Sequence, residues 1–410
     1  MKADRDVSMK RVKIITIAFA FVLVLIAASA QPVAAASRAD TLNSYISGRY
    51  DAQRGGYSPP SDNVVRVDAT YGAVLALNEL KSLDARPPPI NLTKALDSLI
   101  VRQWLTDSQE NELDRKRYGG FSEYLVGPVT MEMTFMGMKL HQLLKAQSDY
   151  PGINTKDINV TALLVYLNRT QSTNGGFSSI PDNDPDIIST YQALAIFEML
   201  DDTYTTMNVW DRLLNETATL EWINNCRKGD AFMLSPEAFT PSVTATAAGI
   251  MALSIFQQVL TIPGIQDTNE WILERQLLSP ESNDFIGGFE EGNGTEDANF
   301  ATTYYALNVL EQTGAISSVN KTAVIDFILN CQAVDGSWGN IPGMEEGTLV
   351  HSGQACELLN ILDSDGAAVI LASSQDPNTP SGFYMDWRFF VVGGILLVAL
   401  VLAIVSIRMD

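Results

Sequence analysis

Apolar residues recur along the chain in runs of two alternating kinds. The runs 70–80, 190–200 and 303–314 are apolar on nearly every helical face, which is typical of helices buried on most sides. The segments 159–171 and 320–332 instead show one apolar stripe and one polar face, as a helix at a protein surface does. The alternation predicts a repeated helical hairpin, with one buried and one surface helix in each copy.

A short turn motif divides these hairpins into six repeats. A glycine-aromatic turn is followed, 13 or 14 residues later, by a Thr or Ser that opens each buried run. The turns are Gly55-Gly56-Tyr57, Gly119-Gly120-Phe121, Gly175-Gly176-Phe177, the degenerate Asp230-Ala231-Phe232, Gly287-Gly288-Phe289 and Asp335-Gly336-Ser337-Trp338. The opening residues, called openers below, are Thr70, Thr134, Thr190, Thr246, Thr303 and Ser352.

Six hairpins in an open row would expose apolar faces at both ends of the row. A closed ring avoids this exposure, with the buried helices inside and the surface helices around them. Glycine accepts the positive φ of a tight turn, and the aromatic residue is expected to fill the gap between neighbouring hairpins. The repeat therefore predicts an all-α fold, an (α/α)6 toroid of six helical hairpins over residues 37–362.

The two ends of the chain carry a different pattern. Basic residues at 10–13, an apolar stretch at 14–28 and small residues up to 36 predict a secretory signal over 1–36, with an uncleaved signal anchor as the alternative. Residues 389–407 contain no charge and match the length that crosses a bilayer. We therefore expect a stalk at 363–388, a transmembrane helix at 389–407 and a tail at 408–410. This arrangement predicts a single-pass protein of the cell membrane with its ring on the extracytoplasmic side.

Charge and cysteine content narrow the classes of partner. The chain has 48 acidic and 27 basic residues and a net charge of −21, which excludes a nucleic-acid partner because phosphate contacts need Lys and Arg. Cys226, Cys331 and Cys356 are too few for a disulfide scaffold. A bond between Cys331 and Cys356 is conceivable outside the cell, and buried free thiols are the preferred interpretation.

The six repeats resemble the α/α-toroid superfamily, which contains protein prenyltransferase β subunits, triterpene and diterpene cyclases and complement-like thioester domains. The resemblance covers about residues 40–362. It is strongest to geranylgeranyl and farnesyl transferase β subunits, whose GGF and TYYAL-like repeats are similar to 287–310 and whose late PG…HT stretch is similar to Pro342-Gly343 and His351-Ser352. It implies a ring around a central ligand cavity.

The resemblance also implies a zinc site and a diphosphate site, and the matching positions test both. The Asp, Cys and His that bind zinc in those enzymes correspond here to Asn299, Ala301 and His351, so one ligand of three remains. The positions of the diphosphate-binding Arg and Lys correspond to Gly292 and Glu296. We therefore expect no prenyl transfer and no cofactor, and a module that binds a small apolar ligand or a protein partner. Zinc at His351 stays as an alternative.

Other chemistry at the ring interior stays open. A divergent prenyltransferase or terpene cyclase using the cavity is one alternative, and a carbohydrate-active or corrinoid-binding ring is another. Asp68 and Glu132 both precede their openers by two residues, a register expected to face the interior. Such a carboxylate pair is suited to acid and base roles on a sugar, or it complements the positive helix N-termini.

Two surface features complete the sequence predictions. Acidic residues gather in the turns of repeats five and six, where an anionic rim would bind calcium or a basic partner, or simply face solvent: Glu290, Glu291, Glu296, Asp297, Glu345 and Glu346. Six N-x-S/T sequons are glycosylation candidates, and the first, second, fourth and sixth of them begin outer helices, where Asn is also a favoured N-cap: Asn91, Asn159, Asn168, Asn215, Asn293 and Asn320.

Overall fold

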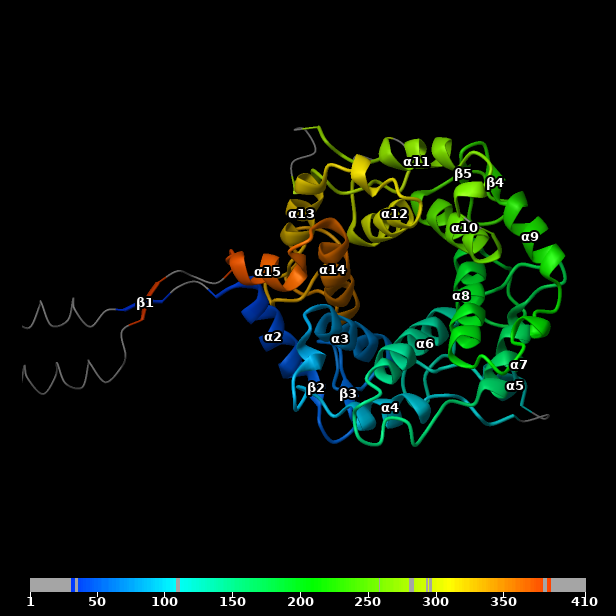
Figure 1. The fold of residues 1–410 in the computed structure, drawn as a ribbon, viewed down its shortest axis with the longest axis horizontal. Coiled ribbons are helices and arrows are strands. Elements are labelled where there is room, and N and C mark those ends of the chain that lie inside the picture. The colour runs from blue at the N-terminus through cyan, green and yellow to red at the C-terminus, as the bar shows by residue number, and fades with distance from the viewer. Residues whose placement is uncertain are drawn as a thin grey trace, which may run out of the picture. The chain divides into compact units, whose positions relative to one another are not determined.

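In the computed structural model, six inner helices close into a ring (Figure 1). The structure describes residues 31–33, 36–107, 111–257, 259–279, 284–292, 294, 297–378 and 382–384. Each inner helix contacts the next, and the last contacts the first, within the compact unit Arg38–Ser374. The inner helices are α3 (Val67–Glu79), α6 (Met131–Ala146), α8 (Ile187–Thr203), α10 (Val243–Phe256), α12 (Phe300–Gln312) and α14 (Leu349–Leu362). The predicted (α/α)6 toroid is confirmed.

A second layer of helices surrounds this ring (Figure 1). The outer helices are α2 (Arg38–Arg49), α4 (Leu92–Ile100), α7 (Val160–Thr170), α9 (Glu216–Asn225), α11 (Ile265–Leu273) and α13 (Lys321–Asn330), with the short α5 (Glu112–Arg117) and α15 (Gly366–Ser373) beside them. The strands among the described residues are short antiparallel pairs: β2 (Tyr50–Asp51) with β3 (Gly56–Tyr57), β4 (Arg227–Lys228) with β5 (Ala231–Phe232), and, outside the unit Arg38–Ser374, β1 (Gln31–Val33) with β6 (Gly382–Tyr384).

The openers explain why the turn and the inner helix always occur together. In every repeat the opener hydroxyl accepts a hydrogen bond from the backbone N–H of the turn aromatic, for example Phe177 N to Thr190 Oγ1 at 2.9 Å and Trp338 N to Ser352 Oγ at 3.1 Å. The same hydroxyl donates to the carbonyl four residues earlier, as Thr190 does to Asp186 at 2.7 Å. A buried hydroxyl thus joins each turn to its helix.

The inner helices begin earlier than the apolar pattern indicates. Each opener lies four residues after the N-cap, so it belongs to the first turn of its helix and does not start it. The helix therefore begins in polar sequence, where a side-chain oxygen caps the free backbone N–H groups. The caps are Thr130, Asp186, Ser242, Asn299 and Thr348, and Arg66 occupies this position in α3 without a side-chain cap.

The turn glycines allow the outer helices to approach closely. Gly119 and Gly287 have φ values of +98° and +96°, which a side chain disfavours. A Cβ at Gly287 would also lie 1.9 Å from the carbonyl oxygen of Ala323 on α13. The neighbouring aromatic rings are completely buried, as Phe121 and Trp338 are. The turn therefore fills the space between hairpins, as the sequence predicts.

The ring unit extends beyond its predicted end. Helix α15 lies inside the region expected to be a stalk, yet it packs on α2 and α14 and belongs to the compact unit. The boundary at residue 362 is therefore too early, because the apolar residues of 366–373 supply a further packing face. The three cysteines are buried and free.

Most of the predicted signal and all of the predicted transmembrane helix lie outside the described residues. Within the described part of the chain, none of the helices has the length and apolar character needed to span a bilayer.

Replacing Thr190 with Val should show how much the buried hydroxyl contributes. The change leaves the Phe177 N–H buried without an acceptor, which costs about 1–3 kcal/mol of unfolding free energy. Chemical denaturation should report that loss. Thr206→Val, at an exposed position after α8, is the matched control and should change stability by less than about 0.5 kcal/mol. Equal effects of the two variants would contradict the role assigned to the opener.

Candidate functional site

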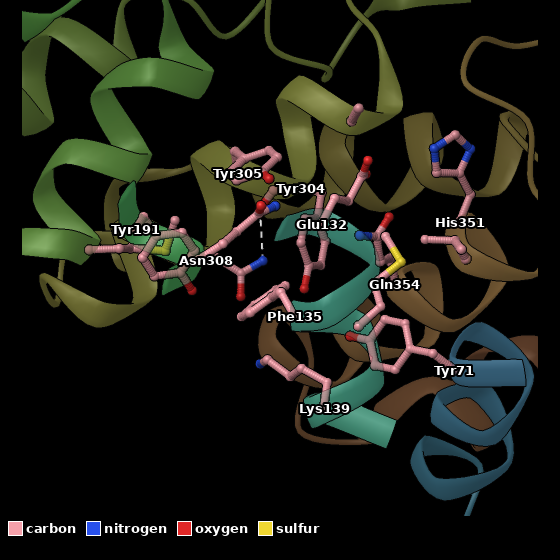
Figure 2. A pocket seen from close by; sticks show the side chains of 15 residues that line it. Tyr71, Glu132, Phe135, Lys139, Tyr191, Tyr304, Tyr305, Asn308, His351 and Gln354 are labelled. Carbon is pink, nitrogen blue, oxygen red and sulfur yellow. Dashed lines mark hydrogen bonds between the residues drawn. The ribbon is translucent and has the colours of Figure 1, made fainter. Parts of the chain in front are cut away.

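One face of each inner helix points to the centre of the ring. The residues two before, one after, two after and five after each opener follow the i, i+3, i+4, i+7 spacing of a single helical face. Side chains at these positions, together with His351 one residue before its opener, enclose a cavity of about 180 Å³ (Figure 2). Its wall consists of Tyr71, Glu132, Phe135, Met136, Lys139, Tyr191, Gln192, Met251, Ala301, Tyr304, Tyr305, Asn308, Val350, His351 and Gln354.

Aromatic rings form much of this wall (Figure 2). The Phe135 and Tyr191 rings lie 5.9 Å apart, and Tyr304 and Tyr305 meet edge to face at 6.0 Å between centroids. Such contacts hold large side chains in fixed positions, which gives a preformed apolar surface. Burial raises the pKa of Tyr305 to about 12 and that of Tyr304 well above its usual value, so both hydroxyls stay protonated.

Ionisable groups lie at the cavity wall on α6 and directly behind it on α14. The Tyr304 hydroxyl donates to Glu357 Oε2 at 2.8 Å, and burial raises the pKa of Glu357. Lys139 is the only Lys or Arg in the described wall, and its ammonium lies 5.6 Å from the Phe135 ring centroid. The described wall is therefore mainly aromatic and amide, with one carboxyl (Glu132) and one ammonium (Lys139), while Glu357 lies next to it through Tyr304.

The structure brings the predicted carboxylate pair to the ring interior only in part. Glu132 lines the cavity, and its pKa is raised by burial and then by the negative charge of Asp68. Asp68 does not line the cavity, although burial raises its pKa too. Its Oδ1 is buried without a hydrogen-bond partner among the described residues. The two groups influence each other electrostatically, and Glu132 is the one placed to touch a ligand.

The residues at the three zinc-like positions have other roles. Asn299 caps α12, its Oδ1 accepting from the Thr302 N–H at 2.9 Å, and Ala301 presents only a methyl group to the cavity. His351 lies beside Phe300, with 5.2 Å between ring centroids, and burial lowers its pKa to about 4. In the parts of the chain described, no three His, Cys, Asp or Glu side chains are placed to share a metal ion.

The acidic rim divides into buried and exposed members. The Glu291 carboxylate accepts hydrogen bonds from Thr244 Oγ1 at 2.7 Å and from Thr302, and so links the first turns of α10 and α12. Glu290 is buried and accepts from the Gly294 N–H at 3.0 Å. The exposed members are Asp297, Glu345 and Glu346, and Glu296 lies outside the described residues. The cluster as predicted is thus not one continuous anionic surface.

The sequons also differ in their placement. Four are exposed N-caps of outer helices, each accepting from the backbone N–H three residues on, at 3.0–3.3 Å: Asn91, Asn159, Asn215 and Asn320. Their predicted capping role is confirmed. Asn168 lies within α7 with a buried side-chain oxygen, and Asn293 is outside the described residues.

The aromatic wall is the part of the site that sequence reasoning missed. Tyr71, Phe135, Tyr191 and Tyr304 each follow an opener directly. This regular position was the signal: an aromatic residue recurring in four of six repeats, on the helical face that the ring turns inward. The apolar pattern alone marks this position only as part of a buried run.

Comparison with known proteins agrees with this architecture. The family model described as the prenyltransferase alpha-alpha toroid domain matches residues 8–225 and 212–366. The geranylgeranyl transferase type-1 subunit beta of Arabidopsis thaliana is 25% identical over 222 residues, which are 52% of this chain and 56% of that protein. The chain thus spans little more than half the length of this relative.

Two solved structures share the fold at low identity. Candida albicans protein geranylgeranyltransferase-I, complexed with GGPP, superposes with a TM-score of 0.56 at 15% identity, covering 79% of this chain and 90% of that one. A glycosidase superposes with a TM-score of 0.53 at 9% identity, covering 79% of this chain and 96% of the other. The sixfold repeat, the closed double ring and the family match together lead to one conclusion: the chain belongs to the prenyltransferase alpha-alpha toroid domain family.

Proposed function

We propose that the ring binds an uncharged, isoprenoid-like apolar molecule in its central cavity and does not transfer diphosphate-activated prenyl groups. The observation that carries this proposal is the composition of the wall: four aromatic residues follow the openers, while Lys139 is the only described wall cation. Apolar pockets with a few polar groups are the usual form of a small-molecule site. The related geranylgeranyltransferase-I was solved with GGPP, which supports an isoprenoid as the ligand class.

Electrostatics favour a neutral ligand over a diphosphate. An anionic group needs preorganised cations or N–H donors in a pocket that excludes water. Here Glu132 and Glu357 place carboxylates at or near the wall, and the Arg and Lys positions implied by the resemblance hold Gly292 and Glu296. An alcohol or hydrocarbon chain meets no such repulsion, and Asn308, Gln192 and Gln354 offer hydrogen bonds to a hydroxyl.

A carbohydrate ligand is the second candidate. Aromatic faces beside a buried carboxylate and several amides are also suited to a sugar, and Glu132 has the raised pKa of a group that can donate a proton. We rank it second because Asp68, the partner expected for acid and base catalysis, does not line the cavity.

Export, membrane anchoring and glycosylation complete the proposal. They rest on the sequence patterns at 1–36 and 389–407 and on the exposed sequons. Glycan attachment at the Asn side-chain nitrogen leaves the oxygen free to cap its helix, so the two roles are compatible.

Titration of the purified protein with geraniol, farnesol and geranylgeraniol, and with the matching diphosphates, tests the ligand class. Each alcohol should bind at least about tenfold more tightly than its diphosphate, because the carboxylates disfavour the anion. Tyr191→Ala should weaken alcohol binding about tenfold or more, and Tyr118→Ala, outside the cavity wall, should not. Glu132→Gln should reduce the ratio of alcohol affinity to diphosphate affinity, because it removes a carboxylate from the wall. Tighter binding of the diphosphates would contradict the proposal, and tight binding of oligosaccharides alone would favour the second candidate.

Metal analysis gives a separate test of the lost transferase chemistry. Protein dialysed against zinc and then against buffer should retain well under one zinc per chain, because Asn299 and Ala301 leave His351 without fellow ligands. His351→Ala should leave the metal content unchanged. If the wild type retains one zinc per chain and His351→Ala loses it, the proposal that the transferase zinc site is absent is wrong.

The sequon caps can be separated from glycosylation with one pair of variants. Asn159→Asp keeps a capping oxygen and removes the acceptor nitrogen, whereas Asn159→Ala removes both and should cost about 1 kcal/mol of stability. In protein made through a secretory pathway, mass spectrometry should find a glycan on Asn159 and none on the helix-embedded Asn168. A glycan on Asn168, or none on any exposed cap, would contradict the assignment.

A further inference from the structure

One ammonium group in the cavity wall has donors that no protein group takes. Lys139 lines the pocket from α6 (Figure 2), and its Nζ lies 5.6 Å from the Phe135 ring centroid. Within the part of the chain that the structure describes, this Nζ makes neither a hydrogen bond nor an ion pair. Lys145, the other lysine of α6, donates to the backbone oxygens of Lys156 at 2.8 Å and of Ile153 at 3.2 Å. Since an ammonium has three N–H donors, Lys139 keeps donors available to whatever occupies the pocket.

Two carboxyl groups compensate the charge of Lys139 without taking its donors. Burial raises the pKa of Glu357 and of Glu198, and the positive charge of Lys139 opposes both rises. Glu357 Oε2 accepts its hydrogen bond from the Tyr304 hydroxyl, at 2.8 Å. A ligand therefore need not bring a negative charge to this part of the pocket. What the ammonium lacks is a neutral oxygen that accepts a hydrogen bond.

An amide of fixed orientation lines the same pocket from α12 (Figure 2). Asn308 Nδ2 donates to the backbone carbonyl of Tyr304 at 2.8 Å, which determines which end of the amide carries the nitrogen. Its Oδ1 accepts no hydrogen bond from the described residues. An amide oxygen accepts up to two hydrogen bonds. The wall thus offers a ligand one set of free donors, on Lys139, and one free acceptor, on Asn308.

We propose that Lys139 and Asn308 form a polar subsite for an alcohol, whose hydroxyl accepts from Lys139 Nζ and donates to Asn308 Oδ1. A hydroxyl is a small neutral group that both donates and accepts, whereas an ether or aldehyde only accepts and a hydrocarbon does neither. A protonated amine would be repelled by the ammonium. The rings of Phe135 and Tyr191, 5.9 Å apart, are placed to hold the hydrocarbon chain. This assignment rests on the proposed binding of a neutral apolar molecule and names its functional group.

Glu132 is the competing position for the hydroxyl. It lies seven residues before Lys139 on α6, which is about 10 Å along the helix axis. A carboxyl group can also bind a hydroxyl. The Lys139 subsite is favoured because it combines a free ionised donor with a free acceptor, and a hydrogen bond from an ionised donor is stronger than one between neutral groups. The two positions place the ligand in opposite directions along α6, so variants can tell them apart.

Titration of the full chain with farnesol, farnesyl methyl ether and farnesene tests the subsite, because these ligands differ in the polar group and share a similar chain. The wild type should bind farnesol at least about tenfold more tightly than farnesene. Lys139→Met removes the donors and keeps an unbranched side chain, so it should weaken farnesol about tenfold and farnesene less than about twofold. Asn308→Leu should abolish the preference for farnesol over the methyl ether, because the ether has no proton to donate.

Lys145→Met is the matched control, since Lys145 lies on the same helix and outside the cavity wall, and it should change each affinity by less than about twofold. Circular dichroism would verify that each variant is folded. Equal weakening of all three ligands by Lys139→Met, or unchanged farnesol binding, would overturn the subsite. A preference for farnesol that is lost in Glu132→Leu and kept in Lys139→Met would overturn it too, by placing the hydroxyl at Glu132. If the wild type binds none of the three ligands, the proposed function fails as well, whereas the preceding outcomes leave that function standing.

Discussion

The architecture depends on one buried hydroxyl in each repeat. The opener accepts the N–H of the turn aromatic and donates to the N-cap carbonyl of its own helix, so a single side chain fixes where the outer helix ends, how the chain turns and where the inner helix begins. In a dry interface these groups have no water to bind, and each would be costly to leave unpaired. Six repetitions of the same contact give six nearly equivalent hairpins, and equivalent hairpins close into a ring.

Closing the ring in turn determines what the centre can be. Once the opener faces the turn, the residues beside it on the helix face inward, which is why the position after the opener supplies the aromatic wall. The same register places Glu132 and Ala301 in the cavity wall, and His351 also lines it. Candida albicans protein geranylgeranyltransferase-I, which shares the fold, was solved with GGPP, whereas here the fold encloses a wall of aromatic residues and amides with one carboxyl, Glu132, and one ammonium, Lys139.

The fold was predictable from the sequence because the same pattern of turn, opener and buried helix occurs six times along the chain. The spacing from turn to opener and the contrast between buried and amphipathic helices were enough to predict the closed ring. Helix starts were not, since Asn299 and its equivalents are polar and the apolar pattern begins only after them. The packing of α15 also escaped prediction, because a short apolar segment in a Ser- and Asp-rich stretch resembles a linker until the surface that it covers is known.

For the site, the sequence could predict only which groups are missing, not which side chains line the cavity. The absence of zinc ligands at positions 299 and 301 can be read from residue identity, whereas the separation of Asp68 from the cavity and the internal hydrogen bonds of Glu291 depend on side-chain packing. Positions near a ring centre converge from six helices that are distant in sequence, so no local pattern shows which of them touch.

An experimental structure of the protein with geranylgeraniol bound would test the central claim most directly. The account predicts an isoprenoid chain lying between Tyr191 and Tyr304, with its hydroxyl near the amide side chains and with no metal at His351. A ligand bound outside the ring with the central cavity left empty, or a diphosphate seated beside Glu132, would contradict it.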